Sequence, residues 1–180
     1  MEISMLEQNI EFKNFTELKE PDALKILEFR NSEEVRKNMM TQDIISKESH
    51  LSFIRRLNKE KTKMYYAIYY NQEIIGSVNL NQIDVNKKSA EWGFYVGIKP
   101  VPHTGKIVLY AFLNMIFSKK NSMDIIYARV LHSNKKSYEI HSFLGFSDKK
   151  IDKLYINLNL KRKDWLSTYK HHAYDYLNQA

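Results

Sequence analysis

The segment from Asn134 to Phe146 contains polar side chains whose types and spacing could support chemistry on a bound small molecule. Ser137 and His141 are four residues apart, so a helix would place both on one face. An imidazole titrates near neutral pH, so His141 could donate a proton to a leaving group as an imidazolium. Tyr138 is a second candidate donor. A histidine that only packs or forms a hydrogen bond is the alternative interpretation.

A carboxylate, Glu91, is the candidate general base. A carboxylate can accept a proton from a bound molecule, directly or through water. Side chains alternate along a strand, which places Glu91 on the same face as Gly93 and Tyr95. The alternative is an outward-facing, solvated glutamate.

The turn Pro100-Val101-Pro102-His103-Thr104-Gly105 is a candidate phosphate site. It joins a predicted strand to a predicted helix, and a turn at a helix N-terminus leaves backbone N–H groups without helical partners. Such groups favour a phosphate or pyrophosphate, and Lys106 could add a positive charge. An ordinary strand-to-helix connection is the alternative for this motif.

The charge balance suits an anionic partner. Net charge is +7, from 28 Lys and Arg against 21 Asp and Glu. The basic residues are spread in pairs, and only Lys161-Arg162-Lys163 forms a denser run, which a solvated surface turn explains. Since no nucleic-acid recognition motif accompanies this charge, we expect a small phosphorylated molecule rather than nucleic acid.

Other function classes are disfavoured by composition. There are no cysteines, which removes disulfides, thiolate metal sites and cysteine nucleophiles. The six histidines lack metal-ligand spacing, so no metal is expected. Neither a secretory signal nor a long apolar segment is visible. We expect a cytoplasmic protein, a monomer or homodimer, with no nucleic-acid or membrane partner.

Hydrophobic periodicity predicts one α/β (α+β) domain over residues 1–166. The order is strand, two helices, three antiparallel strands, helix, strand, helix, strand. Gly145 is expected to end the helix that precedes the last strand. Residues 167–180 are rich in Tyr and His without a clear period and are expected to be a tail, either docked or disordered. The strands are expected over 9–15, 63–70, 73–80, 90–98 and 124–130, with a last strand within 146–160 that alternates most clearly over 154–158. The helices are expected over 21–30, 46–58, 107–116 and 133–144.

The spacing of five of these residues resembles a motif of the GNAT superfamily of N-acetyltransferases. The family pattern reads Asn-x-x-Ala-x-x-x-Tyr-x-x-x-Gly-Phe, and Asn134, Gly145 and Phe146 match it directly. Ser137 replaces the small residue and His141 replaces the tyrosine. The resemblance implies the GNAT fold: a central, mixed but mostly antiparallel sheet with splayed central strands, flanked by helices on both faces.

The resemblance also implies acetyl-CoA as cofactor, bound between the splayed strands near Tyr95 and Asp124. Backbone N–H groups around Tyr95 would hold the thioester oxygen, and the turn would hold the pyrophosphate. The family's turn usually reads Gln/Arg-x-x-Gly-x-Gly/Ala, whereas only Gly105 remains here, between Pro102 and Ile107. The expected cofactor-binding residues are Tyr95, Val96, His103, Thr104, Gly105, Lys106, Ile107, Asn134 and Ser137.

A more specific resemblance covers most of the chain. Glu28-Phe29-Arg30-Asn31, Met39 and His50-Leu51-Ser52-Phe53-Ile54 are similar to segments of the N-acetyltransferases of pseudaminic acid biosynthesis. Those enzymes acetylate the 4-amino group of a UDP-linked amino-dideoxy sugar, and the resemblance implies direct transfer in a ternary complex. The expected acceptor-binding residues are Arg30, Asn31, Met39, Met40, His50, Phe53 and Glu91.

The residue types in this acceptor set allow two interpretations. Arg30 could pair with a nucleotide phosphate, and Met and Phe suit the methyl face of a 6-deoxy sugar. Met39 and Phe53 could equally be core residues. A GNAT enzyme for protein N-termini or polyamines is the alternative within the family, and a non-catalytic acyl-CoA-binding module is the alternative outside catalysis.

Overall fold

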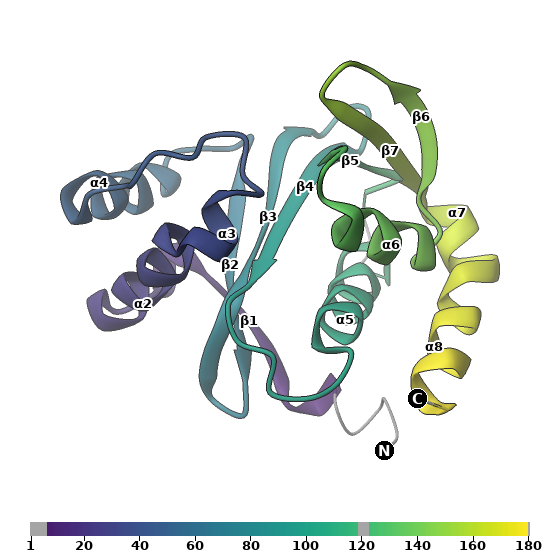
Figure 1. The fold of residues 1–180 in the computed structure, drawn as a ribbon, viewed down its shortest axis with the longest axis horizontal. Helices are drawn as coiled ribbons and strands as arrows, with labels where there is room; N and C mark the ends of the chain where they lie inside the picture. The colour runs from purple at the N-terminus through teal and green to yellow at the C-terminus, as the bar shows by residue number, and fades with distance from the viewer. Residues whose placement is uncertain (1–6, 119–122, 180) are drawn as a thin grey trace.

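A twisted sheet of seven strands organises the molecule (Figure 1). The structure, a computed structural model, describes residues 7–118 and 123–179. Neighbouring strands follow the order β1-β2-β3-β4-β5-β7-β6. The strands are β1 (Ile10–Asn14), β2 (Met64–Tyr70), β3 (Glu73–Asp84), β4 (Ser89–Val96), β5 (Ile125–Leu131), β6 (Ser147–Ile151) and β7 (Tyr155–Lys161).

Every neighbouring pair of strands is antiparallel except β4 and β5, which are parallel. The predicted mixed, mostly antiparallel sheet is therefore confirmed. β6 was not expected as a separate strand. Its sequence, Ser-Asp-Lys-Lys-Ile, lacks apolar alternation because it forms the edge of the sheet, beyond β7.

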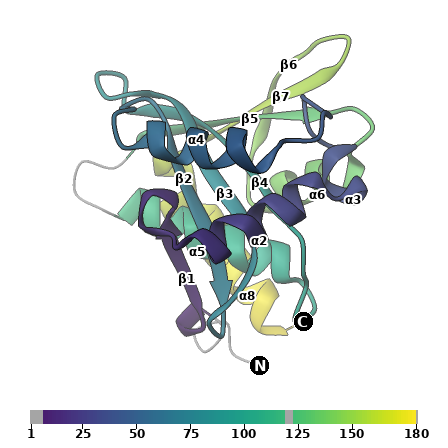
Figure 2. The ribbon, with the colours of Figure 1, turned by 90° about the vertical axis from the view of Figure 1, so that its left-hand side faces the viewer.

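Helices cover both faces of the sheet, as expected (Figures 1 and 2). On one face lie α2 (Glu20–Asn31), α3 (Glu33–Arg36) and α4 (Lys47–Leu57). On the other lie α5 (Thr104–Ser118), α6 (Lys135–Phe143) and α8 (Lys170–Gln179). Three short elements complete the fold: a 3₁₀ turn at Phe15–Glu17, α7 (Arg162–Asp164) and a π-helical turn at Trp165–Tyr169. Within the described residues, no helix combines the length and apolarity that crossing a membrane requires.

Local signals set several helix boundaries. The Ser46 side chain accepts a hydrogen bond from the Ser49 N–H, as the predicted cap of α4 requires. Gly145 follows the end of α6 with φ of 85°, a left-handed conformation that favours glycine. A Cβ atom at this position would also collide with the ring of Tyr169. The predicted stop at Gly145 is confirmed.

The main core lies between the sheet and α5. Val108, Leu109, Phe112 and Leu113 of α5 are fully buried there. The Trp92 indole of β4 stacks near Phe112 and, at a centroid distance of 5.0 Å, on Phe146. This packing fixes α5, and with it the turn before α5, relative to β4.

The C-terminal segment docks as a helix. Trp165 is fully buried and donates its indole N–H to the Asn114 side chain at 3.3 Å. Ala173 and Leu177 of α8 join the main core cluster. For residues 167–180, the sequence analysis left open whether the tail is docked or disordered. Only these two α8 side chains are buried, which explains why no helical period was visible.

Candidate active site

The sheet opens between β4 and β5. The two strands pair at only three positions: Ser89 with Ile125, Ala90 with Ile126, and Glu91 with Tyr127. Beyond them β4 stays paired with β3 and β5 with β7, but residues 92–96 and 128–131 do not pair with each other. Backbone groups along these inner edges therefore line a slot in the sheet. The sequence analysis expected the central strands to splay. The point at which they part corrects one detail of the expected cofactor position.

Asp124 lies at the closed end of this slot, not beside it. Its backbone N–H donates to the Lys88 carbonyl at 2.6 Å, one residue before the paired positions begin. The expectation that a cofactor lies near Asp124 is therefore wrong. Tyr95 does lie at the open end, since the strands have already parted there. The β5 side of the slot is formed by residues 128–131, and the chain continues from it to Asn134.

The turn before α5 carries a pocket. His103 has φ of 58°, which turns the chain sharply, and the buried Thr104 hydroxyl closes the turn by bonding to Val101. Ile107 is part of the core and donates its N–H to the His103 carbonyl at 3.1 Å, so this N–H is not available to a ligand. The pocket is lined by Lys99, Pro100, Val101, Pro102, His103, Thr104, Gly105, Lys106 and Ile140.

Asn134 caps α6. Its side-chain oxygen accepts the Ser137 N–H at 3.1 Å, so this oxygen holds the helix start. Ile140 of the same helix lines the pocket on the turn. The first residues of α6 thus follow the open end of β5, and the middle of the helix faces the turn before α5. The helix therefore lies beside both predicted parts of a cofactor site, the slot and the turn.

His141 is a buried, neutral histidine. The Trp92 indole N–H donates to Nε2 at 3.0 Å. An indole N–H can only donate, so Nε2 accepts, and the ring proton is on Nδ1. Nδ1 lies 2.7 Å from the Ser137 carbonyl, to which it donates. The side chain is 3% exposed, and burial lowers its pKa to about 4.

The expectation that His141 donates a proton as an imidazolium is therefore corrected. Both ring nitrogens already have partners, and the rings of Trp92, Phe94 and Phe146 surround the imidazole at centroid distances of 5.0 to 5.7 Å. Charging it would cost desolvation energy and break the bond from the indole. The alternative, a histidine that packs and forms hydrogen bonds, describes the geometry. Tyr138, half-buried on the same helix, remains a candidate donor.

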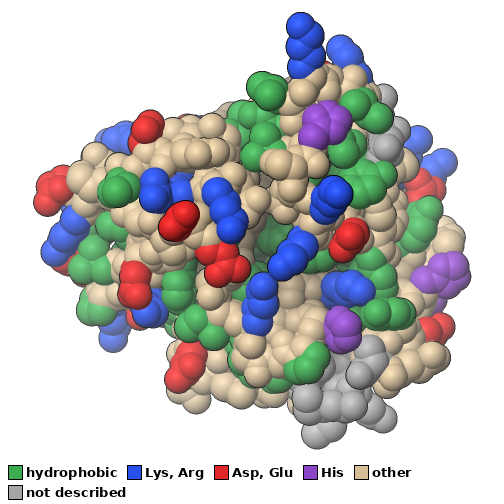
Figure 3. Space-filling model, viewed as in Figure 1, with side chains coloured by type: hydrophobic (Ala, Val, Ile, Leu, Met, Phe, Trp, Pro, Cys, Tyr) green, Lys and Arg blue, Asp and Glu red, His purple; other side chains and the backbone are tan. Residues whose placement is uncertain are grey.

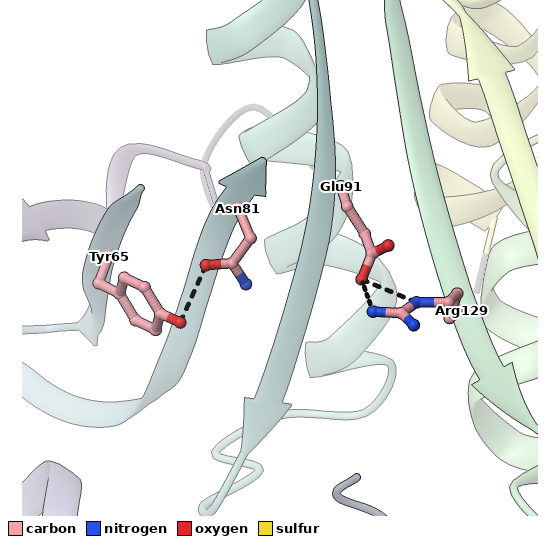
Figure 4. A network of polar contacts seen from close by, with 4 residues as sticks. All are labelled: Tyr65, Asn81, Glu91 and Arg129. Carbon is pink, nitrogen blue, oxygen red and sulfur yellow. Dashed lines mark hydrogen bonds and ion pairs between the residues drawn. The ribbon is translucent and has the colours of Figure 1, made fainter. Parts of the chain in front are cut away.

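Glu91 is bound by an arginine that the sequence analysis missed. Arg129 of β5 donates Nε at 3.1 Å and Nη2 at 2.9 Å to the same oxygen, Oε1 (Figure 4). The Glu91 side chain is 19% exposed, so it is not the fully solvated glutamate of the alternative. Residues 124–130 were interpreted as an apolar run, but alternation opposite Ile126 and Ala128 places Arg129 on the other face of the sheet.

A polar strip continues from Glu91 across the sheet. Asn81 pairs with Glu91 in the β3–β4 register and accepts a hydrogen bond from the Tyr65 hydroxyl at 3.0 Å (Figure 4). Glu91 and Arg129 also line a pocket with Asp84, Lys87, Tyr127 and Lys150. Figure 3 shows Lys and Arg side chains gathered beside a hollow near the middle of the face viewed in Figure 1. These features fit a polar, anionic ligand.

Two of the expected acceptor-binding residues are used within the fold. Asn31 binds the backbone of Ile45 twice, donating Nδ2 to its carbonyl at 2.8 Å and accepting its N–H at 2.9 Å. The His50 ring is buried, and its Nε2 lies 3.0 Å from the Ala23 carbonyl. These side chains tie the loop before α4, and α4 itself, to α2. Both polar atoms of Asn31 and the Nε2 of His50 are therefore already occupied.

Arg30 is the member of this set with an unsatisfied group. Its Nη2 donates to the Thr41 carbonyl at 2.7 Å, whereas Nη1 is buried and has no partner among the described residues. Burial lowers the pKa of the guanidinium, and the nearby Tyr95 hydroxyl opposes that shift. A buried donor without a partner is costly, which is typical of a group that meets a ligand.

The remaining acceptor candidates are apolar. Phe53 packs edge-on to Tyr65 at 5.0 Å and belongs to the small core cluster beneath α2 and α4. Met39 is half-buried, and Met40 is 59% exposed on the loop that follows α3. Among the described residues, no group of three or more His, Asp or Glu side chains is placed to hold a metal ion.

Comparison with known proteins places this geometry in a family. The family model described as "Acetyltransferase (GNAT) domain" matches residues 16–166. The acetyltransferase PseH of Campylobacter jejuni subsp. jejuni serotype O:23/36 (strain 81-176) is 30% identical over 159 residues. That match covers 86% of this chain and 96% of the relative.

Solved structures have the same fold. The crystal structure of Campylobacter jejuni N-acetyltransferase PseH in complex with acetyl coenzyme A superposes with a TM-score of 0.68 and 26% identity, covering 84% of this chain and 98% of that one. Spermidine N-acetyltransferase from Vibrio cholerae in complex with CoA and spermine gives a TM-score of 0.76. Its identity is only 15%, over 89% of this chain and 99% of that one, so it supports the fold alone.

The neutral state of His141 can be tested by NMR. With a pKa of about 4, its ring resonances should not titrate between about pH 5.5 and 8. His141→Phe assigns the signal by its disappearance. A His141 midpoint near 6.5 would contradict the buried, neutral assignment.

The same shift has a consequence for stability. The unfolded chain binds this proton below about pH 6.5, but the folded chain does so only near 4. The contribution of neutral His141 to stability is therefore complete above pH 6.5 and is lost as the pH falls towards 4. It amounts to roughly 3 kcal/mol at most. Urea unfolding of wild type and His141→Phe should show a shallower pH dependence in the variant.

Proposed function

Because this chain belongs to the GNAT family of acetyltransferases, we propose that its acceptor is the 4-amino group of a UDP-linked amino-dideoxy sugar, as in pseudaminic acid biosynthesis. The chain is an N-acetyltransferase that uses acetyl-CoA. The observation that carries the finer proposal is the 30% identity to an acetyltransferase named PseH over nearly the whole of both chains. The unsatisfied Arg30 group supports it independently.

The described residues fit the cofactor. The slot between residues 92–96 and 128–131 offers backbone groups to an extended amide-bearing arm. The pocket on the turn, with Lys106 and the residues from His103 to Gly105, suits a pyrophosphate. When bound there, acetyl-CoA supplies an acetyl group activated as a thioester. Asn134 and Ser137 set the start of α6 beside the slot, so their part is to position this wall of the site.

Glu91 is the proposed base. Arg129 binds only Oε1, which leaves Oε2 to accept a proton from an arriving ammonium, directly or through one water. The guanidinium also fixes the direction of the carboxylate at the point where β4 and β5 part. Tyr138 is the proposed acid, holding a proton at Oη for the departing sulfur. His141, already neutral and paired, positions Trp92 instead.

The acceptor site is proposed to extend from Glu91 towards α2. Arg30 Nη1 is a donor suited to a nucleotide phosphate, and Met39 and Met40 offer apolar contact to a deoxy-sugar methyl group. A polyamine carries several positive charges, which a chain of net charge +7 would repel. A module that only binds acyl-CoA would not need a partly buried base bound by an arginine at the slot. We therefore favour a nucleotide-sugar acceptor.

The acceptor class can be tested by mass spectrometry. Purified protein is incubated with acetyl-CoA and a mixture of UDP-4-amino sugars, spermidine and peptides with free N-termini. We expect one acetyl group to be added to a UDP-amino sugar, because its phosphates meet cationic side chains and its amine can meet Glu91. Turnover of spermidine or peptide alone would contradict the proposed acceptor. Tight CoA binding without any turnover would support the non-catalytic module instead.

The Glu91–Arg129 pair can be tested by steady-state kinetics. Glu91→Gln should lower kcat by about a hundredfold or more, because the amide cannot accept the proton of the arriving ammonium. Arg129→Gln should lower kcat/KM by about tenfold, because the carboxylate is then no longer held in one direction. Lys59→Gln, at an exposed position that does not line this pocket, is the control. An unchanged kcat/KM for Arg129→Gln would contradict the positioning role.

A further inference from the structure

Lys106 is held between two aromatic rings from different helices. Its ammonium lies 4.4 Å from the ring centroid of Phe143, the last residue of α6. It also lies 4.4 Å from the ring centroid of Tyr176 on α8. The two rings contact each other edge to face, with centroids 5.0 Å apart. A lysine placed over two rings is attracted by both quadrupoles, so its long side chain is held in one region.

This three-residue cluster lies at the pocket on the turn before α5. Lys106 and His103 both line that pocket, and the His103 ring contacts Tyr176 at a centroid distance of 6.0 Å. In the described part of the chain, no carboxylate forms an ion pair with Lys106. Its charge is therefore not neutralised by the protein, although it stands beside a pocket suited to phosphate.

We propose that the C-terminal helix α8 is part of the cofactor site, where Tyr176 and Phe143 hold the Lys106 ammonium in position to bind a phosphate of coenzyme A. The inference rests on the use of this turn by the cofactor in the proposed function. The family match ends at residue 166, so α8 lies outside the matched domain. The proposed role of α8 therefore belongs to a part of the chain that the family match does not cover.

The physical advantage is a smaller ordering cost. A lysine side chain has several freely rotating bonds, and binding an anion normally restricts them. Here the rings restrict them beforehand, so more of the charge interaction contributes to affinity. The rings face part of the ammonium, and an N–H group that points away from them can donate to a phosphate oxygen. Tyr176 is 44% exposed, so removing its ring does not open the core.

Calorimetric titration of coenzyme A tests the proposal without using activity. Tyr176→Leu removes the ring, Tyr176→Phe retains it, and Lys106→Met removes the charge. Tyr174→Leu is the control, because Tyr174 is a similarly exposed tyrosine on the same helix. We expect Tyr176→Leu to weaken binding about threefold to tenfold and Lys106→Met at least as much. Tyr176→Phe and Tyr174→Leu should bind like wild type.

The double variant and a second ligand sharpen the result. In the Lys106→Met background, Tyr176→Leu should cause no further loss, because the ring acts through the ammonium. With 3′-dephospho-coenzyme A, loss of the lysine effect would identify the 3′-phosphate as its partner, whereas an unchanged effect would identify the pyrophosphate. Either outcome supports the proposal.

Two results would overturn the inference while leaving the proposed function in place. One is wild-type affinity in Tyr176→Leu, and the other is a loss that is undiminished in the Lys106→Met background. A wild-type chain that bound no coenzyme A would instead contradict the proposed function itself. Circular dichroism of each variant checks that a changed affinity does not arise from unfolding.

Discussion

The parting of β4 from β5 after Glu91 and Tyr127 is the constraint on which the rest of the site depends. A parallel pair normally continues to the ends of its strands, because each unpaired backbone group loses a hydrogen bond. The structure indicates what draws β4 away. At the first unpaired position, Trp92 stacks on Phe146 and donates its indole N–H to His141 of α6. The strand is thus held by α6 and α5 rather than by β5.

This arrangement gives two neighbouring residues opposite tasks. Trp92 points into the apolar core, where its contacts maintain the slot. Glu91 points to the other face, where Arg129 binds its carboxylate at the point where the two strands part. Strand alternation therefore places a structural residue and the proposed base next to each other in the chain. His141, which replaces the family's usual tyrosine, belongs to the structural part.

The periodicity of the sequence was sufficient to predict most of the fold. Buried elements such as α5 have strong apolar patterns, and turn or cap residues such as Ser46 and Gly145 have local causes. β6 and α8 were harder, because an edge strand and a helix with two buried side chains have weak patterns. The site residues depend on contacts between distant segments. The bond between Arg129 and Glu91 joins residues 38 apart, and no local pattern indicates it.

Burial explains the main error in the predicted chemistry. His141 was assigned a charge from its ordinary titration range, but it lies in a cage of aromatic rings that only the folded chain assembles. Similarly, Asn31 and His50 have the polar atoms of ligand-binding residues but use them to hold α2, α4 and the loop between them. Arg30 shows the converse: its unsatisfied nitrogen becomes evident only when all its neighbours are known.

Hydrogen–deuterium exchange along the slot tests the central claim most directly. If residues 92–96 and 128–131 are unpaired with each other and receive the cofactor arm, their slot-facing amides should exchange faster than those of β3 in the free protein. Saturating coenzyme A should then slow them selectively. Exchange that is equally slow with and without coenzyme A would mean that the strands are closed, and the account would be contradicted.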